Sequence, residues 1–238
     1  MKKLFVLLTL LCALGSVAAQ DHKQAEPQKA EPQNKLIEFQ MALLKRGPKV
    51  MPRNWQGSPL RQQHLSYMRS LLEAGKVVIA GPVMDDPELR GVVILRAKSA
   101  DEARSWVMAD PAVAAEFFAV EMHPWWSEDV MKKTTTPTQM MTAYLAFLVR
   151  GDKWTPEKTP QTEAIQKAHL ANINKLAEMK KLVVAGPFGD NGTLRGIFVF
   201  RVNSMAEARE LAATDPAVQA GRLALQIYTW MVPEGILP

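Results

Sequence analysis

The sequence predicts an α+β protein made of two tandem ferredoxin-like units, each with the order β-α-β-β-α-β, packed on each other as a pseudo-dimer within one chain. Three observations predict this: the chain repeats itself at an offset of 105 residues, each copy alternates strand-like and helix-like patterns, and the uncovered sheet face is apolar. Of the 238 residues, 47% are hydrophobic and 22% are charged, which is ordinary for a globular protein. This composition excludes a wholly disordered chain, a collagen-like chain and a bundle of membrane spans.

The repeat runs without a gap from the pair His64/His169 to the pair Trp125/Trp230, and about 25 of these 62 aligned pairs are identical. A match at a fixed period over this length indicates that one unit is written twice. We expect the first unit over residues 36–126, a polar linker over 127–139 and the second unit over 140–233. The longest shared strings are 79–82 with 184–187, 89–91 with 194–196, 102–104 with 207–209 and 110–113 with 215–218.

The first elements of each unit are predicted from apolar spacing and from helix-start residues. Over residues 37–43, apolar side chains alternate with Glu38 and Gln40, as in a strand with one solvated face. Ser58 followed by Pro59 is typical of an N-cap and a first helical residue. We therefore expect a strand and then a helix, and the second copy repeats both.

The remaining elements follow from short apolar runs and a capping motif. Residues 77–80 and 91–95 read as buried strands. Ser99 and Glu102 have the capping-box spacing that begins a second helix, and the apolar run 118–122 closes the unit. Two helix-bearing crossovers place both helices on one face of an antiparallel sheet.

Such a sheet leaves its other face uncovered. The residues expected there are Gln40, Ala42 and Leu44 in the first copy and Tyr144, Ala146 and Leu148 in the second. An exposed apolar face would be adhesive, so we expect the two sheets to pack face to face within the chain. The protein would then be a monomeric pseudo-dimer, with further dimerisation between chains left open.

The N-terminus has the pattern of a cleavable signal peptide. Two lysines precede an apolar run over 4–14, and Val17 and Ala19 stand at the −3 and −1 positions of a cut before Gln20. The run is too short to cross about 30 Å of hydrocarbon. We expect residues 1–19 to be removed and the protein to be periplasmic or secreted, with no membrane association after cleavage; an uncleaved N-terminal anchor is the alternative.

The single cysteine, Cys12, lies inside the predicted signal peptide, and Leu11 before it does not fit a lipoprotein cut. The mature chain would then contain no thiol, which excludes a cysteine nucleophile, a disulfide framework, an iron–sulfur cluster and a thiolate zinc site. Residues 20–35 are polar and repeat Ala-Glu-Pro-Gln, so we expect a flexible tether. The formal net charge of +5 is scattered along the chain, which argues against a nucleic-acid partner.

The candidate site residues are the titratable groups that both copies share. His64 and His169 correspond, as do Asp110 and Asp215, whereas His123 is replaced in the second copy. Each histidine could be a hydrogen-bonded core residue, and each Asp-Pro pair could be an N-cap for a short helix. The shared arginines, Arg90 and Arg195, are expected to form surface ion pairs.

Two strings occur in the same order in each copy: "HLSYMRSLLEAGKVVIAGP" and "ADPAVAAEFF" in the first, "HLANINKLAEMKKLVVAGP" and "TDPAVQAGRL" in the second. The chain resembles the YCII-related (YciI-like) family over roughly residues 36–126 and 140–233. This resemblance implies a ferredoxin-like fold that pairs as a dimeric α/β barrel. It also implies a catalytic site centred on His64 with Asp110, and on His169 with Asp215. The family includes a dehydrochlorinase-like enzyme acting on a small aromatic, which implies lyase- or isomerase-type proton chemistry.

We therefore hypothesise an exported enzyme that acts on an unidentified small molecule through His/Asp general acid–base chemistry. A carboxylate that accepts from one imidazole nitrogen leaves the other nitrogen to act as base or acid. No phosphate-binding loop, dinucleotide fingerprint or metal-ligand motif is present, so we expect neither a cofactor nor a metal. The alternative is a non-catalytic small-molecule-binding or structural module of the periplasm.

Overall fold

The computed structural model describes residues 35–132 and 139–238, which all fall within one unit of the chain. The predicted signal peptide and all but the last residue of the predicted tether lie outside the described residues. Within the described ranges, no helix is long and apolar enough to cross a membrane.

The described residues form two consecutive halves with the same element order. The first half contains β1 (Ile37–Arg46), η1 (Trp55–Gly57), α1 (Pro59–Glu73), β2 (Val77–Pro82), β3 (Leu89–Leu95), α2 (Ala100–Met108), α3 (Pro111–Ala114) and β4 (Phe118–Ser127). The second half contains β5 (Met140–Arg150), α4 (Pro160–Glu178), β6 (Leu182–Pro187), β7 (Leu194–Phe200), α5 (Met205–Ala213), α6 (Pro216–Gln219) and β8 (Leu223–Pro233).

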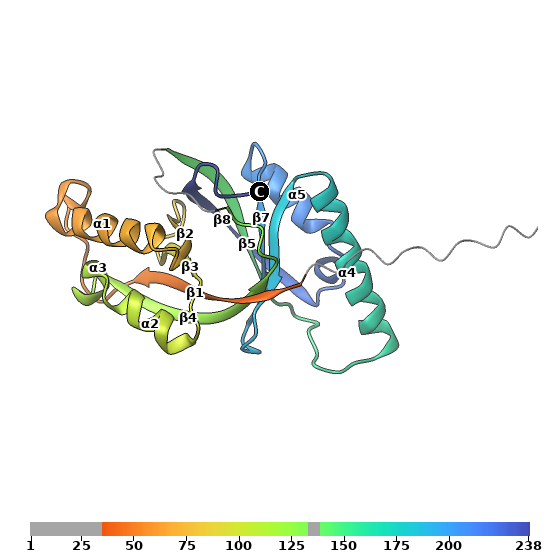
Figure 1. Ribbon diagram of the computed structural model, residues 1–238. Coiled ribbons are helices and arrows are strands. Elements are labelled where there is room, and N and C mark those ends of the chain that lie inside the picture. The colour runs from red at the N-terminus through yellow and green to blue at the C-terminus, as the bar shows by residue number, and fades with distance from the viewer. Residues whose placement is uncertain (1–34, 133–138) are drawn as a thin grey trace, which may run out of the picture. The chain divides into compact units, whose positions relative to one another are not determined.

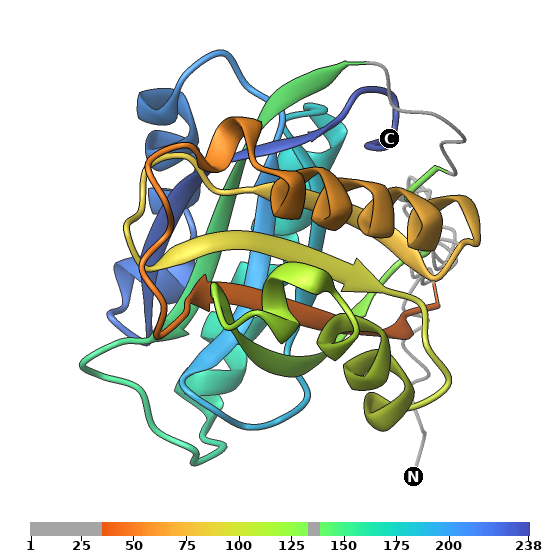
Figure 2. The ribbon, with the colours of Figure 1, turned by 90° about the vertical axis from the view of Figure 1, so that its left-hand side faces the viewer.

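Each half forms one four-stranded antiparallel sheet. The strand order is β2-β3-β1-β4 in the first half and β6-β7-β5-β8 in the second. The two central strands of each sheet are therefore the first and third of its half, which is the ferredoxin-like arrangement. Figure 2 looks onto the first half, where the helices lie in front of their sheet. The predicted fold class is confirmed.

The helix starts follow the capping residues that the sequence indicates. The Ser58 side chain accepts a hydrogen bond from the Arg61 backbone N–H at 3.1 Å, and Ser99 does the same for Glu102 at 3.1 Å. The Glu102 carboxylate accepts from the backbone N–H of Lys98, one residue before the N-cap, at 2.7 Å. One unpaired donor of the first turn of α2, the Glu102 N–H, is thus satisfied, and the Glu102 carboxylate binds the chain just before the N-cap rather than the N-cap itself as in a full capping box.

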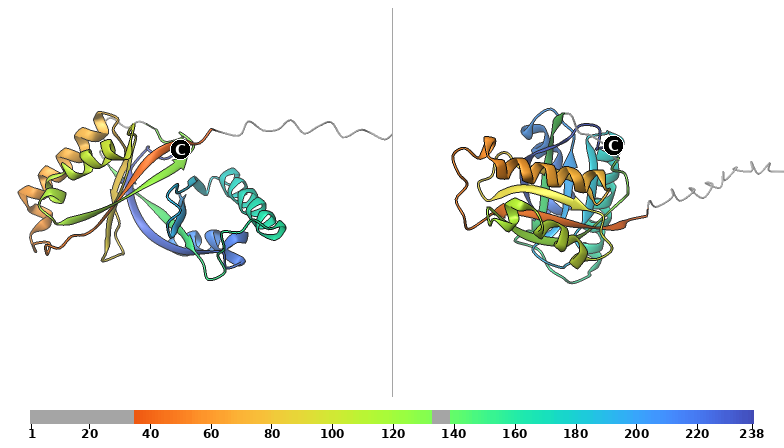
Figure 3. Two further views of the ribbon diagram at one scale, coloured as in Figure 1. Left: turned by 90° about the horizontal axis from the view of Figure 1, so that it is seen from below. Right: turned by 60° about the vertical axis from the view of Figure 1, so that its left-hand side comes forward.

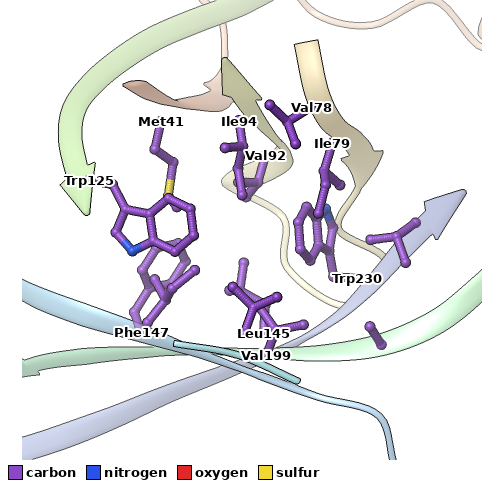
Figure 4. Close-up of a cluster of buried hydrophobic side chains, with 14 of the residues drawn as sticks. Met41, Val78, Ile79, Val92, Ile94, Trp125, Leu145, Phe147, Val199 and Trp230 are labelled. Carbon is purple, nitrogen blue, oxygen red and sulfur yellow. The ribbon is translucent and has the colours of Figure 1, made fainter. Parts of the chain in front are cut away.

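The two sheets pack face to face, with the helices of each half on the outside (Figures 1 and 3). One continuous hydrophobic cluster fills the space between the sheets and draws on both halves. Figure 4 shows Trp125 and Trp230 in this cluster, with Met41 from β1 and Leu145 and Phe147 from β5. The intrachain pseudo-dimer is thus a sheet-on-sheet core, which is the architecture of a dimeric α/β barrel.

The prediction of which side chains face the other sheet was wrong by one position along each strand. Ala42 and Leu44 pack under α1 and α2, and Tyr144, Ala146 and Leu148 pack with the helices of their own half. The faces between the sheets carry the alternate set: Phe39, Met41 and Leu43 from β1, and Ala143, Leu145, Phe147 and Val149 from β5. The polar Gln40 pointed to an open face, yet it is buried on the helix side and donates to Glu38.

A reciprocal contact joins the halves at the Ala-Gly-Pro strings. The Trp230 indole N–H donates to the Gly81 carbonyl, and the Trp125 indole N–H donates to the Gly186 carbonyl, both at 3.1 Å. An isolated β-bridge accompanies each contact, and the first of them joins Val83 to Trp230. Each half thus makes the same contact with the other through corresponding residues, as expected for a two-fold-related interface.

Candidate functional site

The predicted histidines and aspartates lie on two elements that pack against each other in each half. His64 is in the middle of α1, and Asp110 is the N-cap of the short helix α3. In the second half, His169 lies on α4 and Asp215 is the N-cap of α6. Pro111 follows Asp110 at the first helical position, where its fixed φ suits a helix start.

The structure brings His64 and Asp110 together. His64 Nδ1 lies 2.7 Å from Asp110 Oδ2, and the other carboxylate oxygen, Oδ1, accepts from the backbone N–H groups of Ala112 at 2.8 Å and Val113 at 3.2 Å. The aspartate is fully buried, whereas 14% of the His64 side chain is exposed. Asp110 therefore both caps α3 and binds His64, using one carboxylate oxygen for each interaction.

The second half repeats this geometry. His169 Nδ1 lies 2.7 Å from Asp215 Oδ2, and Asp215 Oδ1 accepts from Ala217 at 2.9 Å and Val218 at 3.4 Å. Asp215 is also fully buried, and 11% of the His169 side chain is exposed. The same interaction is thus present in both halves, and in each the histidine and the aspartate are 46 residues apart in the sequence.

The hydrogen bond fixes what each imidazole can do. An ionised carboxylate can only accept, so Nδ1 carries the proton and Nε2 of a neutral ring holds a free lone pair. Burial and the negative charge of Asp110 both raise the pKa of the nearby Tyr67, whose hydroxyl donates to the Trp106 carbonyl at 2.8 Å. In each pair the aspartate thus favours a proton on Nδ1, and Nε2 has no hydrogen-bond partner among the described residues.

Aromatic rings hold the imidazoles in place. The His64 ring lies 5.5 Å from the ring of Phe118, centroid to centroid, and the His169 ring stacks on Phe198 at 6.0 Å. Apolar neighbours around a polar ring limit its rotation and exclude water from its faces. The aspartate and the aromatic ring together keep the orientation of each histidine.

His64 lies on the wall of a cavity of about 720 Å³. The wall is built from α1, η1 and the strands β2 and β3, with Met140 and Pro233 contributed by the second half. This volume is in the usual range of small-molecule sites, about 300–1,000 Å³. A histidine with a free nitrogen thus lies at a cavity large enough for a small organic ligand.

The expected surface ion pairs of Arg90 and Arg195 are not formed among the residues that the structure describes. Arg90 lines the cavity, and its Nε is buried with no hydrogen-bond partner in the described part of the chain. Arg195 lies over the Trp154 ring, 5.7 Å from its centroid, and its Nη1 is likewise buried without a partner there. The sequence drew attention to both arginines only because they occupy the same position in the two copies of the repeat.

A third histidine, His123, has two carboxylate partners that the sequence did not indicate. Its Nδ1 lies 2.5 Å from Asp190 of the other half, and its Nε2 lies 2.8 Å from Glu121. Although burial raises the pKa of both acids, hydrogen bonds from His123 to both, and from Lys45 to Glu121, hold the pKa of each below its ordinary value. With both ring nitrogens occupied, His123 joins the two halves rather than facing a ligand.

Within the two described ranges, no group of three or more His, Cys, Asp or Glu side chains is placed to hold a metal ion. Cys12 lies outside these ranges. The titratable side chains that line the cavity are His64, Arg61, Arg69 and Arg90, and Asp110 contacts His64.

Comparisons with known proteins agree with the duplicated fold. The sequence model of the YCII-related domain family matches residues 39–125 and 146–231. The uncharacterized protein YjpA of Bacillus subtilis (strain 168) is 33% identical over 90 residues, which cover 38% of this chain and 95% of YjpA.

Among solved structures, a mutant of chlorite dismutase from Candidatus Nitrospira defluvii is similar, with a TM-score of 0.53 and 10% identity. The similarity covers 83% of this chain and 92% of that chain. A heme-binding protein from Thermus thermophilus has a TM-score of 0.52 and 13% identity, covering 82% and 92% of the two chains. Likeness at this identity extends to the fold alone.

Proposed function

The chain belongs to the YCII-related domain family, and from that premise we propose that it is an enzyme that moves a proton on a small molecule, with His64 and His169 as general acid–base residues. One observation carries the proposal: a buried aspartate lies 2.7 Å from Nδ1 of the corresponding histidine in both halves. A purely structural N-cap needs only one carboxylate oxygen, and here the second oxygen orients an imidazole.

The geometry supports a proton shuttle. Nε2 of His64 takes a proton from a carbon or hydroxyl of the ligand, and the imidazolium that forms is stabilised by the Asp110 carboxylate. The same nitrogen returns the proton to another atom of the ligand, which isomerises it. Alternatively, the electron pair left on the ligand expels a leaving group, and the imidazolium gives its proton to that group as it departs, which is a lyase reaction. The reaction class is thus proton transfer without a covalent enzyme intermediate.

The proposal extends to the setting of the enzyme. We propose that residues 1–19 direct export and are cut off before Gln20, that 20–35 is a tether, and that the working protein is a monomeric pseudo-dimer in the periplasm or outside the cell. Its two units span 36–126 and 140–233, joined by the linker 127–139. Its partner is a small molecule rather than a nucleic acid.

The non-catalytic alternative predicts a different response to mutation. If His64 and His169 only fill the core, His→Asn variants should lose stability and keep any ligand effect. If they form a catalytic site, these variants should keep their melting temperature and lose the turnover found by screening a metabolite library against the wild-type protein. The single and double variants are compared, because each half carries its own pair.

The sharpest variant is Asp110→Asn, with Asp215→Asn as its counterpart. The amide oxygen of asparagine can still accept from Ala112 and Val113, so the cap of α3 is preserved. The amide nitrogen, facing His64 Nδ1, can only donate, and this moves the imidazole proton to Nε2. Because either pair could sustain turnover alone, we expect turnover to fall by about 10²–10⁴ in the double variant Asp110→Asn/Asp215→Asn, the usual contribution of general acid–base catalysis, with little loss of stability. Unchanged turnover would contradict the proposal.

The reaction is proposed to need no cofactor. Protein that shows no haem absorption band should therefore turn over its substrate at the full rate, and added haem should not increase it. Turnover that depends on added haem would contradict this part of the proposal.

A further inference from the structure

We propose that the cavity beside His64 binds a small organic anion, with Arg90 holding its carboxylate and an aromatic wall holding its apolar body. This inference rests on the proposed function, because it names the class of ligand that the same site would take. Its basis is the arrangement of charge in the cavity.

The charged side chains that line the cavity are all basic. They are Arg61, Arg69 and Arg90, together with the titratable His64, and no aspartate or glutamate of the described residues is among the lining residues. Asp110 lies behind His64 and is fully buried. A ligand inside the cavity therefore meets positive charge first, which favours an anion and raises its local concentration.

Arg90 differs from the other two arginines in its surroundings. Arg61 already donates to the Gln56 carbonyl at 3.3 Å, and Arg69 is exposed on α1. Arg90 is only partly exposed, its Nε is buried without a hydrogen-bond partner, and none of the described carboxylates lies within ion-pair distance of it. Removing a charged donor from water is unfavourable unless a partner replaces the lost hydration. A ligand anion would be that partner.

The fold keeps Arg90 at this place. It lies at the start of β3, where its backbone carbonyl accepts from the Val83 N–H at 3.0 Å. The guanidinium group has a planar fork of donors that matches the two oxygens of a carboxylate, and such paired hydrogen bonds are stronger than single neutral ones. A carboxylate in the cavity would thus accept from two donors of this fork together.

The rest of the wall suits a flat apolar body. Trp55 and Phe118 both line the cavity and meet edge to face, with ring centroids 6.0 Å apart. Met68 lines it from α1. Since Phe118 also packs against the His64 ring at 5.5 Å, an aromatic group against this wall lies beside the general base. The ligand class is therefore an aromatic or similarly flat monocarboxylate.

Calorimetric titration with benzoate, and with uncharged benzamide of the same shape, tests this inference. The titrations use concentrations up to about 10 mM, since a fragment of this size binds in the millimolar to micromolar range. We expect wild-type protein to bind benzoate, and Arg90→Gln to weaken it about 10- to 100-fold, as expected for a charge-assisted pair. Arg90→Lys, which keeps the charge without the fork, should lie between the two.

Two further variants separate this inference from the proposed function. Arg46→Gln removes the same charge from an exposed residue paired with Glu88, and should bind benzoate like the wild type. His64→Asn should bind benzoate within about fivefold of the wild type, because the carboxylate is held by Arg90. No benzoate binding, equal binding of benzamide, or equal affinities of Arg90→Gln and Arg46→Gln would overturn the inference. Benzoate binding that needs Arg90, together with turnover that survives in the His64 and His169 variants, would instead overturn the proposed function alone.

Discussion

Gly81→Ala tests the contact between the two halves at its tightest point. A Cβ at Gly81 would lie 1.7 Å from the Met231 carbonyl oxygen and 3.3 Å from the Trp230 indole nitrogen. Real Cβ atoms essentially never approach another atom within 3.0 Å. Strand β8 would therefore have to move away from β2 by more than about 1 Å, which a close-packed interior resists.

The expected loss of stability follows from this displacement. Overpacking costs about 1–3 kcal/mol, and lengthening the hydrogen bond from Trp230 to Gly81 adds about 0.5–1.5 kcal/mol. We therefore expect the free energy of unfolding to fall by about 2–4 kcal/mol. At about 2–4 °C per kcal/mol for a domain of this size, the melting temperature should drop by about 4–16 °C.

Urea and thermal unfolding measure this loss, followed by the fluorescence of the buried tryptophans. Gly57→Ala is the matched control, because nothing lies within 4 Å of its added methyl group and its backbone needs no glycine. The control should stay within about 0.5 kcal/mol of the wild type. If Gly81→Ala is as stable as Gly57→Ala, the sheet-on-sheet contact at β2 and β8 is not what holds the protein together.

Two further predictions concern the same interface. Trp230→Phe removes the indole N–H that donates to the Gly81 carbonyl of the other half, and should lower the free energy of unfolding by about 1–3 kcal/mol, measured by urea unfolding. Trp126→Phe is the control: its side chain is exposed, so the free energy of unfolding should change little. Unfolding experiments at a series of pH values should show that the wild type loses more stability than His123→Asn between pH 7 and pH 3. In the folded protein the pKa values of Glu121 and Asp190 lie below their ordinary 4.5 and 3.8. The contribution of these two acids to stability is therefore fully present above the ordinary values and is lost as the pH falls through the lower folded-state values. Parallel pH profiles of the two proteins would refute this assignment.

The repeat made most of the architecture predictable. A period of 105 residues implied two equal units, and local signals such as Ser58 and Ser99 set the helix starts because capping depends on neighbouring residues alone. The His64–Asp110 proximity was predicted from the family resemblance, since no local pattern relates residues 46 positions apart.

The misassigned sheet face has a physical reason. In β1, six consecutive residues are buried, because helices cover one face of the strand and the second sheet covers the other. A strand buried on both faces carries apolar residues on both of them, so alternation no longer distinguishes the face toward the helices from the face toward the other sheet. Only the contacts of Met41 and Ala42 in the folded protein distinguish the two faces.

Charged residues were harder to place than apolar ones. An arginine is ordinarily solvated or ion-paired, and whether Arg90 finds a carboxylate depends on which loops surround it. One of the two carboxylate partners of His123, Asp190, likewise comes from the other half, 67 residues away. Such interactions arise from tertiary structure, so the sequence showed which residues recur and not which of them lack a partner.

The tautomer of His64 tests the central claim most directly, and nitrogen NMR of ¹⁵N-histidine-labelled protein measures it without a known substrate. We expect a protonated Nδ1 and an unprotonated Nε2 in the wild type at a pH of about 8, well above the ordinary pKa of histidine, with the signals assigned from the His64→Asn variant. We expect the opposite tautomer in Asp110→Asn, since an amide donates where the carboxylate accepted. A wild-type ring protonated on Nε2, or a tautomer that does not change in Asp110→Asn, would contradict the claim that the aspartate prepares His64 as a base.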